Sequence, residues 1–397
     1  MRSATDNPFT PGYGVVPQVF AGRQPEFADF EGVVLKRVAE GIYEPARLLT
    51  GDRGMGKTAL LKQFEAEAIE AGHWVVRVSA VRGDAIIADL LEALANVLVD
   101  RDATSDLGRE ARAALKRVAG LVIGRTGVTV QETPKKSASG RAHKDLTEIL
   151  VAVGRIARDR DAAVLLLLDE AQNIDRATIG ALFHAFQEAQ GTTVTEQHET
   201  GATLRAHLPL AIYVAGLPGL PAALRAAGST FGERARRVEL GLLSEGDVAE
   251  ALAAFAAQAD VTVDADAADR FVELAGGYPY FLHVLGSATW NAGEDMVITR
   301  DDVQAGWKHA LPSIDLFYEE RLRDLTDTQR HYLEAMARLD PDERTSGNVA
   351  RSLGSTTEAV GSTQQALIET HGIIRRIGRG RVAFTLPGID RHLVETA

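Results

Sequence analysis

The chain has 397 residues, of which 45% are hydrophobic and 25% charged, the composition of a globular protein long enough for two or three domains. Its 43 basic and 55 acidic residues leave a formal net charge of −12. This charge argues against a protein that binds nucleic acid over its whole surface, although it leaves room for one basic patch. Because the chain has no cysteine, disulfides, thiolate nucleophiles and cysteine-based zinc or iron–sulfur sites are excluded.

No apolar run in the sequence approaches the ~18 residues that a membrane span needs. The longest one, Val164–Leu168, is followed by two acidic residues. The polar N-terminal segment Met1–Tyr13 lacks the apolar stretch of a secretory signal. We therefore expect a cytoplasmic protein with no membrane partner.

Short apolar runs alternate with helical periods from about residue 26 to residue 240. This alternation predicts an α/β fold in which helices cover both faces of a parallel sheet. The expected strands are Arg47–Thr50, Trp74–Ser79, Val164–Leu168, Leu210–Val214 and Arg237–Leu240. The expected helices include Lys57–Ala71, Ala85–Val99, Leu146–Arg158 and Ile179–Ala189. Two polar stretches, Thr126–Arg141 and Gly191–Arg205, predict loops or short hairpins.

The pattern changes after residue 243 and indicates two further domains. Ser244 to about Leu311 reads as purely helical, with capping boxes at Ser244 and Thr299. The last segment reads as three helices, Asp327–Ala337, Ser346–Leu353 and Thr356–Thr370, and then two strands, Ile373–Ile377 and Val382–Thr385. That order is typical of a winged helix-turn-helix. The expected domains are an N-terminal arm (1–18), a nucleotide-binding domain (19–241), a helical lid (242–312) and a winged helix (313–397).

A phosphate-binding loop is predicted between the first strand and the first long helix. The sequence there matches G-x-x-x-x-G-K-[ST] and consists of Gly51, Asp52, Arg53, Gly54, Met55, Gly56, Lys57 and Thr58, followed by Ala59. Glycines let backbone N–H groups surround an anion, and the helix N-terminus adds partial positive charge. Lys57 is expected to bind the outer phosphates, and Thr58 to offer a hydroxyl to Mg²⁺. The alternative is a glycine-rich turn with a chance Lys-Thr pair.

Two acidic residues follow the apolar run Val164–Leu168. Ligands bind beyond the carboxyl ends of parallel strands, so carboxylates there lie where a nucleotide site is expected. Asp169 is the candidate that holds Mg²⁺ through water, and Glu170 is the candidate base for the attacking water. A plain helix N-cap is the alternative. The pair favours hydrolysis over binding alone.

An arginine is expected to neutralise the charge that develops in the transition state. Arg234 precedes the last strand in the run Gly232–Arg237, and we select it as the catalytic arginine. The alternative is a solvated basic turn. The sequence leaves open whether Arg234 acts in its own subunit or on a neighbour.

Together these motifs resemble the AAA+ ATPases of the branch that includes origin-recognition initiators, and also the STAND signalling ATPases. Val19–Glu26 resembles a segment that lies against adenine in these families, which implies a role for Val19, Phe20 and Arg23. Gly277-Tyr278-Pro279 resembles the GxP turn of the lid, whose proline packs near the base. The likeness implies ATP or ADP as the nucleotide, and it extends to large uncharacterised bacterial AAA ATPases with a C-terminal winged helix.

The chain departs from this family at two sensor positions. The fourth strand ends in the apolar residues Val214-Ala215-Gly216, where Asn, Ser or Thr is usual. The helix after Pro279 offers no sensor 2 arginine, and His283 either contacts phosphate or packs in the helix. The departures predict a slow ATPase or a nucleotide switch.

The C-terminal hairpin is basic and carries four arginines that predict phosphate contacts with DNA, namely Arg375, Arg376, Arg379 and Arg381. The helix before it, Thr356–Thr370, contains Glu358 and Glu369 and no basic residue. Gln364 and Gln365 are its candidates for contacts with base edges. The alternative is a domain that docks protein or another part of the chain.

The sequence is therefore compatible with two functions. One is an ATP-dependent switch associated with double-stranded DNA. The other is a STAND-like regulatory ATPase that captures a protein or self-associates when ATP binds. A P-loop kinase is a third reading, and the tandem Asp169-Glu170 argues against it.

Overall fold

The computed structural model describes residues 1–12, 14–83, 86–100, 121–124, 127–130, 139–197 and 203–396. The chain divides into two compact units. The sheet unit consists of Gln24–Gly51 and Lys57–Leu240. The helical unit consists of Met1–Arg23, Asp52–Gly56 and Gly241–Ala397. The five residues of the phosphate-loop motif from Asp52 to Gly56 thus group with the helical unit.

A five-stranded parallel sheet forms the centre of the sheet unit, with the order β2-β5-β8-β1-β9. All five expected strands are present. Side chains of β5 and β8 are buried along their whole length, which explains why both read as continuous apolar runs. The strands are β1 (Arg47–Thr50), β2 (Trp74–Ser79), β5 (Val164–Asp169), β8 (Leu210–Gly216) and β9 (Arg236–Glu239).

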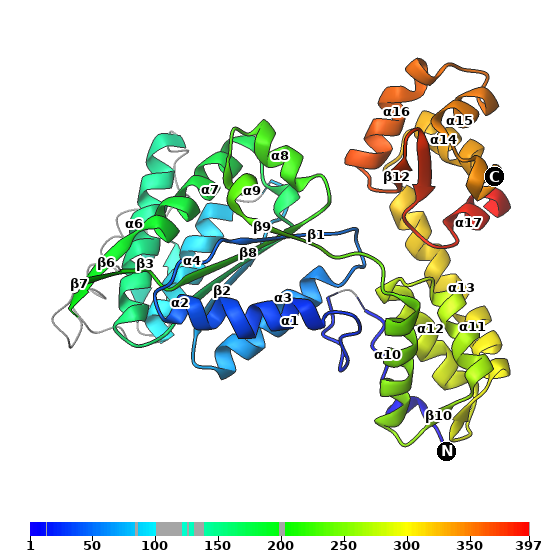
Figure 1. Ribbon diagram of the computed structural model, residues 1–397, viewed down its shortest axis with the longest axis horizontal. Helices are drawn as coiled ribbons and strands as arrows, with labels where there is room; N and C mark the ends of the chain where they lie inside the picture. The colour runs from blue at the N-terminus through cyan, green and yellow to red at the C-terminus, as the bar shows by residue number, and fades with distance from the viewer. Residues whose placement is uncertain are drawn as a thin grey trace. The chain divides into compact units, whose positions relative to one another are not determined.

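Helices cover both faces of this sheet, as the alternating pattern predicts (Figure 1). One face carries α1 (Gln24–Asp29), the π-helical η2 (Phe30–Leu35), α2 (Lys36–Ala39) and α3 (Lys57–Glu70). The other carries α4 (Ile86–Asp100), α6 (Ser139–Arg158) and α7 (Arg176–Gly191). The expected helices are all confirmed, although α6 begins at Ser139 and not at Leu146.

The segment from α1 to α2 is not among the helices that we expected from the sequence. It is held by aromatic packing, because the Phe30 ring stacks on Phe64 of α3 at 4.1 Å between centroids. Tyr213 of β8 meets both rings edge-on, at 5.7 and 5.2 Å. Such contacts between distant segments leave no periodic signal in the local sequence.

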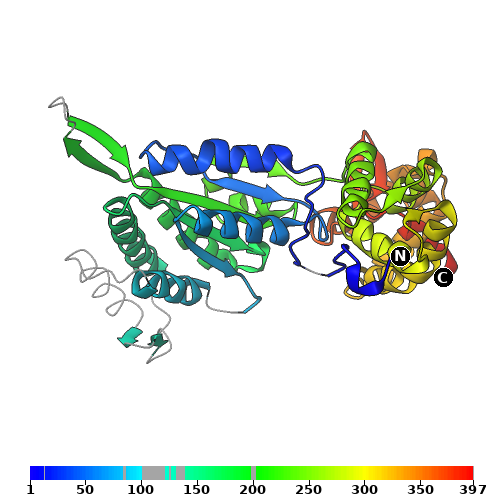
Figure 2. The same cartoon turned by 90° about the horizontal axis from the view of Figure 1, so that it is seen from below.

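Two hairpins and several short elements complete the described part of the sheet unit. Within the polar stretch 191–205, residues 198–202 lie outside the described residues, and the segments on either side pair as β6 (Thr193–Gln197) and β7 (Thr203–His207). These two strands extend beyond the neighbouring helices in Figure 2. Within the stretch 126–141, residues 126 and 131–138 lie outside the described residues. The remaining elements are β3 (Leu121–Gly124), β4 (Gly127–Val130), η3 (Ala171–Asn173), α8 (Leu220–Ala226) and α9 (Phe231–Arg234).

The first part of the helical unit is built mostly from helices. Both expected capping boxes are present, at Ser244 and Thr299. The expectation of a purely helical segment is wrong, because β10 and β11 form a parallel pair of two residues each. Strands this short are below the length at which periodicity can be detected. The elements are η1 (Ala4–Asp6), α10 (Glu245–Ala257), β10 (Thr262–Val263), α11 (Ala265–Ala275), α12 (Pro279–Ala292), β11 (Val297–Ile298) and α13 (Arg300–Leu322).

Helix α13 runs without interruption through Pro312, so the domain boundary expected after residue 312 falls inside a helix. Proline removes one backbone donor from a helix and usually ends or bends it. Here Pro312 lies on the exposed side of the helix, while Ala310 and Ile314, two residues to either side, are buried.

The C-terminal part of the helical unit contains the expected three helices and antiparallel hairpin. A final helix, α17, follows the hairpin and was not expected. Among the helices of the described residues, none has the length and apolar content to cross a membrane. The elements are α14 (Asp327–Ala337), η4 (Pro341–Glu343), α15 (Ser346–Ser352), α16 (Thr357–Glu369), β12 (Ile374–Gly378), β13 (Arg381–Phe384) and α17 (Ile389–Thr396).

Candidate functional site

The predicted phosphate loop connects β1 to α3, and its glycines adopt the conformations that the motif requires. Gly54 and Gly56 both have φ of +84°, a region that L side chains rarely adopt. A Cβ on Gly51 would lie 2.5 Å from the carbonyl oxygen of Leu240, so only glycine fits there. Gly51 and Gly56 are the two glycines that the motif specifies, whereas Gly54 occupies one of its variable positions.

Lys57 is the first residue of α3 and is only 6% exposed. Its ammonium group donates a hydrogen bond to the carbonyl oxygen of Gly51 at 2.7 Å. Burying a lysine is costly unless its charge is compensated. A buried ammonium at a helix N-terminus is arranged to meet an anion.

Thr58 and Asp169 come together at the carboxyl edge of the sheet, as their predicted common role requires. The Thr58 hydroxyl donates to Asp169 Oδ2 at 2.7 Å, and the Glu170 backbone N–H donates to Asp169 Oδ1 at 2.8 Å. Burial raises the pKa of the Asp169 carboxyl, and these two hydrogen bonds offset part of the rise. A hydroxyl beside a buried carboxylate is an all-oxygen donor set, which fits Mg²⁺.

Glu170 follows β5 in a left-handed backbone conformation, with φ of +52°. This conformation costs a non-glycine residue roughly 1–3 kcal/mol and is concentrated at active sites. The Glu170 carboxylate accepts a hydrogen bond from the side chain of Gln172. The two neighbouring carboxylates therefore have different surroundings. Asp169 is buried, and Glu170 is partly exposed.

Gln172 is a site residue whose role the sequence analysis missed. Its side-chain nitrogen donates to the Glu170 carboxylate, and its side-chain oxygen accepts from the Leu217 backbone N–H at 3.1 Å. The amide thus links the exit of β8 to Glu170. It supplies a polar group at the end of β8, where Val214-Ala215-Gly216 has none. The only sign of this role in the sequence is that a glutamine follows the candidate base, Glu170, by two residues.

Replacing Gln172 with alanine (Q172A) is expected to lower kcat for ATP hydrolysis about 10-fold, the effect of losing one hydrogen bond to a charged group. ATP affinity is expected to stay unchanged, because the two hydrogen bonds of the Gln172 amide join Glu170 and Leu217 and involve no residue of the phosphate-loop motif. Steady-state kinetics together with binding of a non-hydrolysable ATP analogue would measure both quantities. Gln63→Ala, on α3, is the matched control. An unchanged kcat with weakened ATP binding would contradict this positioning role.

Arg234 is the last residue of α9, and its side chain is exposed. The two nearby arginines are engaged within the sheet unit. Arg236 pairs with Asp29 at 2.9 Å, and Arg237 donates to the carbonyl oxygen of Gly232 at 3.3 Å. Arg234 is thus the arginine of this run that is best placed to reach an external phosphate, and its catalytic role stays a prediction.

Within the helical unit, the segment Asp52–Gly56 is contacted by Tyr278 and Arg23. The fully buried Tyr278 donates its hydroxyl to the carbonyl oxygen of Arg53. Its ring fills the space beside Gly54, where a Cβ would lie 2.7 Å from the Tyr278 ring. Arg23 donates to the carbonyl oxygen of Met55 at 3.3 Å and to that of Gly241 at 3.0 Å.

These contacts show what the residues that the family resemblance assigned to adenine do in the structure. Arg23 holds the backbone of the loop segment. Pro279 opens α12, directly after Tyr278, and its packing near a base stays a prediction. Val19 and Phe20 are half-buried in the irregular segment before α1. Their contact with a base stays a prediction.

His283 of α12 packs in the helical unit. Its ring lies 5.4 Å from the ring of Phe255, and its Nδ1 accepts from the Thr10 N–H at 3.3 Å. Burial lowers the pKa of His283 to about 4, so the side chain is neutral at pH 7. A neutral imidazole that already accepts a hydrogen bond favours the packing role over a phosphate contact.

The C-terminal hairpin exposes the four predicted arginines, Arg375, Arg376, Arg379 and Arg381. Arg381 pairs with Asp342 at 3.1 Å across the surface. One base-contact candidate on α16 is corrected, because Gln364 is 7% exposed and its Oε1 accepts from the Tyr332 hydroxyl. Helical periodicity places Gln364 one turn after the buried Val360 and therefore in the core. Gln365 is exposed and donates to Glu369.

Family models match two parts of the chain. The model of a family described as AAA ATPase domain matches residues 19–196, and that of a domain of unknown function (DUF8462) matches residues 315–393. No curated protein matches the chain.

Two similar solved structures share the fold. The Walker-type ATPase PABY2304 of Pyrococcus abyssi has 16% identity and a TM-score of 0.60, with coverage of 94% of this chain and 96% of that one. The ORC2 protein of Aeropyrum pernix, solved in ADPNP–ADP complexes, has 12% identity and a TM-score of 0.56, with coverage of 96% and 94%. The chain therefore carries an AAA ATPase domain over residues 19–196 and shares its fold with the Walker-type ATPase PABY2304 and the ORC2 protein.

Proposed function

We propose that this AAA ATPase-domain protein binds ATP and hydrolyses it slowly to ADP and phosphate. The observation that carries the proposal is the cluster at the carboxyl edge of the sheet, where the buried Lys57 lies beside the hydrogen-bonded pair Thr58 and Asp169. Backbone N–H groups of the motif from Gly51 to Ala59 would surround the phosphates. The ADPNP–ADP complexes of the similar Aeropyrum pernix ORC2 protein support an adenine nucleotide.

The residues divide the chemistry between them. Glu170 accepts a proton from water as the water oxygen forms a bond to the γ-phosphorus and the bond to the β-phosphate oxygen breaks. Lys57 and Arg234 offset the negative charge of the transition state. Thr58 and Asp169 would hold Mg²⁺, which when bound neutralises phosphate charge. Gln172 orients Glu170 through its amide.

Hydrolysis is expected to be slow because the chain lacks two of the groups usual in the family it resembles. The exit of β8 is apolar, and α12 offers the neutral His283 where a sensor 2 arginine is usual. A slow ATPase persists in its ATP-bound state long enough for a partner to respond to that state. We therefore propose a nucleotide switch and not a fast motor.

Aromatic side chains within the helical unit offer a physical route by which such a switch could act. Tyr278 contacts the loop segment and also packs on Phe281 and Phe317, at 4.9 and 5.8 Å between ring centroids. Tyr318 packs on Phe281 at 5.8 Å and on His392 of α17 at 5.1 Å. The contacts form a contiguous packed chain from the loop segment to the C-terminal helix, and coupling through such a chain is the hypothesis.

For the C-terminal segment we propose a winged helix that binds double-stranded DNA. The helix order and the exposed basic hairpin support this proposal. Four phosphate contacts would give a salt slope of roughly −3.6 for the logarithm of the binding constant.

The double variant R379A/R381A tests the DNA proposal. We expect it to weaken DNA binding and to reduce the magnitude of the salt slope by about 1.8, since each lost phosphate contact accounts for roughly 0.9. Fluorescence anisotropy with a labelled duplex at several salt concentrations, with and without ATP, would measure both. The control R300A/R338A removes two exposed arginines from α13 and the end of α14. DNA affinity and slope equal to those of the unmodified chain would reject the proposal.

A second function is favoured by the surface of α16. This helix exposes Glu358 and Glu369, carries no basic residue and buries Gln364. An acidic recognition helix opposes DNA phosphates, so the same segment could instead mediate protein contacts in a STAND-like regulatory ATPase. That function predicts nucleotide-dependent self-association or partner capture. Light scattering with ATP, with ADP and without nucleotide separates the two, because a monomer in all three states argues against the STAND-like function.

A further inference from the structure

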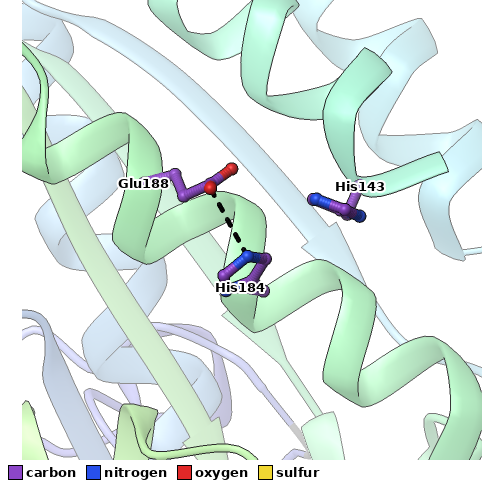
Figure 3. A group of neighbouring side chains, drawn as sticks. All are labelled: His143, His184 and Glu188. Atoms are coloured by element: carbon purple, nitrogen blue, oxygen red, sulfur yellow. Dashed lines mark ion pairs between the residues drawn. The ribbon is translucent and has the colours of Figure 1, made fainter. Parts of the chain in front are cut away.

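Two histidines and one glutamate form a cluster between α6 and α7 that the ATPase function does not use. His143 lies near the start of α6, and His184 and Glu188 lie one turn apart on α7. Figure 3 shows the three side chains gathered in one space between the two helices. One ligand atom from each residue lies within 4.8 Å of the other two. We name these residues the α6–α7 cluster.

The spacing of this cluster fits a metal ion after small side-chain movements. Zinc binds imidazole nitrogen and carboxylate oxygen at about 2.0–2.2 Å, so two ligand atoms in tetrahedral coordination lie roughly 3.3–3.5 Å apart. The His184 Nε2 and Glu188 Oε1 atoms are already 3.4 Å apart. The rings of His143 and His184 have their centroids 4.9 Å apart. Rotation of the half-exposed side chains of His184 and Glu188 can bring their ligand atoms closer to that of His143, from within 4.8 Å to the tetrahedral spacing.

The glutamate of the cluster is oriented by a neighbouring hydroxyl. Thr147 Oγ1 lies 3.2 Å from Glu188 Oε2 and 2.9 Å from the carbonyl oxygen of His143. The single hydroxyl hydrogen of Thr147 is shared between these two acceptors, so one carboxylate oxygen of Glu188 lies within hydrogen-bond reach of Thr147 and the other lies 3.4 Å from His184 Nε2. Hydrogen bonds of this kind orient ligands in metal sites and strengthen metal binding.

The two helices provide a rigid support for the cluster. Leu146 and Ile149 of α6 and Leu182 and Phe183 of α7 are completely buried in the core of the sheet unit. Backbone positions on packed helices are well defined, so a site built on them keeps its geometry better than one on loops. Only side-chain rotation is then needed to complete the coordination.

The ligand types select the class of ion. Imidazole nitrogen suits zinc, cobalt and nickel, whereas Mg²⁺ and Ca²⁺ prefer oxygen throughout. The cluster supplies two nitrogens and one carboxylate, which differs from the all-oxygen pair Thr58 and Asp169. We propose that His143, His184 and Glu188 bind one divalent transition-metal ion of the zinc class, with a fourth position open to water. The ion would clamp the start of α6 to α7.

Metal binding by the full chain tests this proposal, with Zn²⁺ and Co²⁺ as probes. Competition with a chromophoric chelator is expected to show one Zn²⁺ per chain, and Co²⁺ to give the visible absorption of a low-coordinate nitrogen–oxygen site. H184A and E188A are each expected to weaken Zn²⁺ binding at least about 10-fold, and T147V about 10-fold, as is typical for lost groups that orient ligands. H184Q, which keeps a polar side chain, checks the loss if H184A misfolds.

Controls separate this site from other histidines and from the nucleotide. H309A removes an exposed histidine of α13, and E148Q changes an exposed acid of α6. Neither is expected to change Zn²⁺ affinity, and D169N is expected to retain it as well, because Asp169 belongs to the nucleotide site. Absence of stoichiometric Zn²⁺ binding, or equal affinity of the cluster variants and the unmodified chain, would overturn the proposal. Neither result would bear on ATP hydrolysis.

Discussion

Replacing Lys57 with alanine (K57A) is expected to weaken ATP binding by roughly 30-fold to several thousand-fold, which corresponds to about 2–5 kcal/mol. The reason is that the Lys57 ammonium group is buried at the N-terminus of α3, where bulk water cannot replace it as a partner for phosphate. Calorimetric titration with a non-hydrolysable ATP analogue would measure the loss of affinity.

The control for this experiment is K62A. Lys62 is a lysine of the same helix that lies outside the phosphate-loop motif, so its removal makes the same change in net charge. We expect K62A to bind ATP as the unmodified chain does. Equal ATP affinity of K57A and the unmodified chain would show that the loop does not bind the phosphates.

The second large effect is expected for Glu170. The substitution Glu170→Gln keeps the size of the side chain and removes its basicity, so ATP hydrolysis should fall by about 10²- to 10⁴-fold while ATP binding persists. Gln172 can still contact the new amide, so the loop after β5 should keep its shape. Release of phosphate under saturating ATP, together with analogue affinity, would measure the two effects separately.

E148Q serves as the matched control, because it makes the same chemical change at an exposed position of α6. We expect normal hydrolysis from that variant. Normal ATP hydrolysis by the Glu170→Gln variant would show that Glu170 is not the base. The ATP-bound form of this variant would also be the best state in which to capture a protein or nucleic-acid partner, since its nucleotide persists.

Local patterns predicted the framework of the sheet unit well. β5 reads as a strand because its burial on both faces demands five consecutive apolar residues before Asp169. The α3 helix is marked by its amphipathic period and by the glycines before it. Hydrophobic periodicity and turn chemistry are properties of neighbouring residues, and so they are visible in the sequence.

Contacts between distant residues were not predictable in the same way. Gln172 acquires its role from Leu217 and Glu170, which are brought together only by the packing of β8 beside β5. Tyr278 contacts Arg53, more than two hundred positions earlier in the chain. The presence of a glutamine or a tyrosine in a sequence does not indicate which distant residue it contacts.

The sequence by itself determined which chemistry is possible here. Its Gly51–Thr58 motif and its Asp169-Glu170 pair are the candidates for phosphate binding and water activation, and the absence of cysteine excludes thiolate chemistry. Only the tertiary structure decided which polar side chains act together: Gln172 with Glu170, Gln364 with the core, and His143 with His184 and Glu188. The physical reason is that hydrogen bonding and coordination act over a few ångströms in space, whatever the separation along the chain.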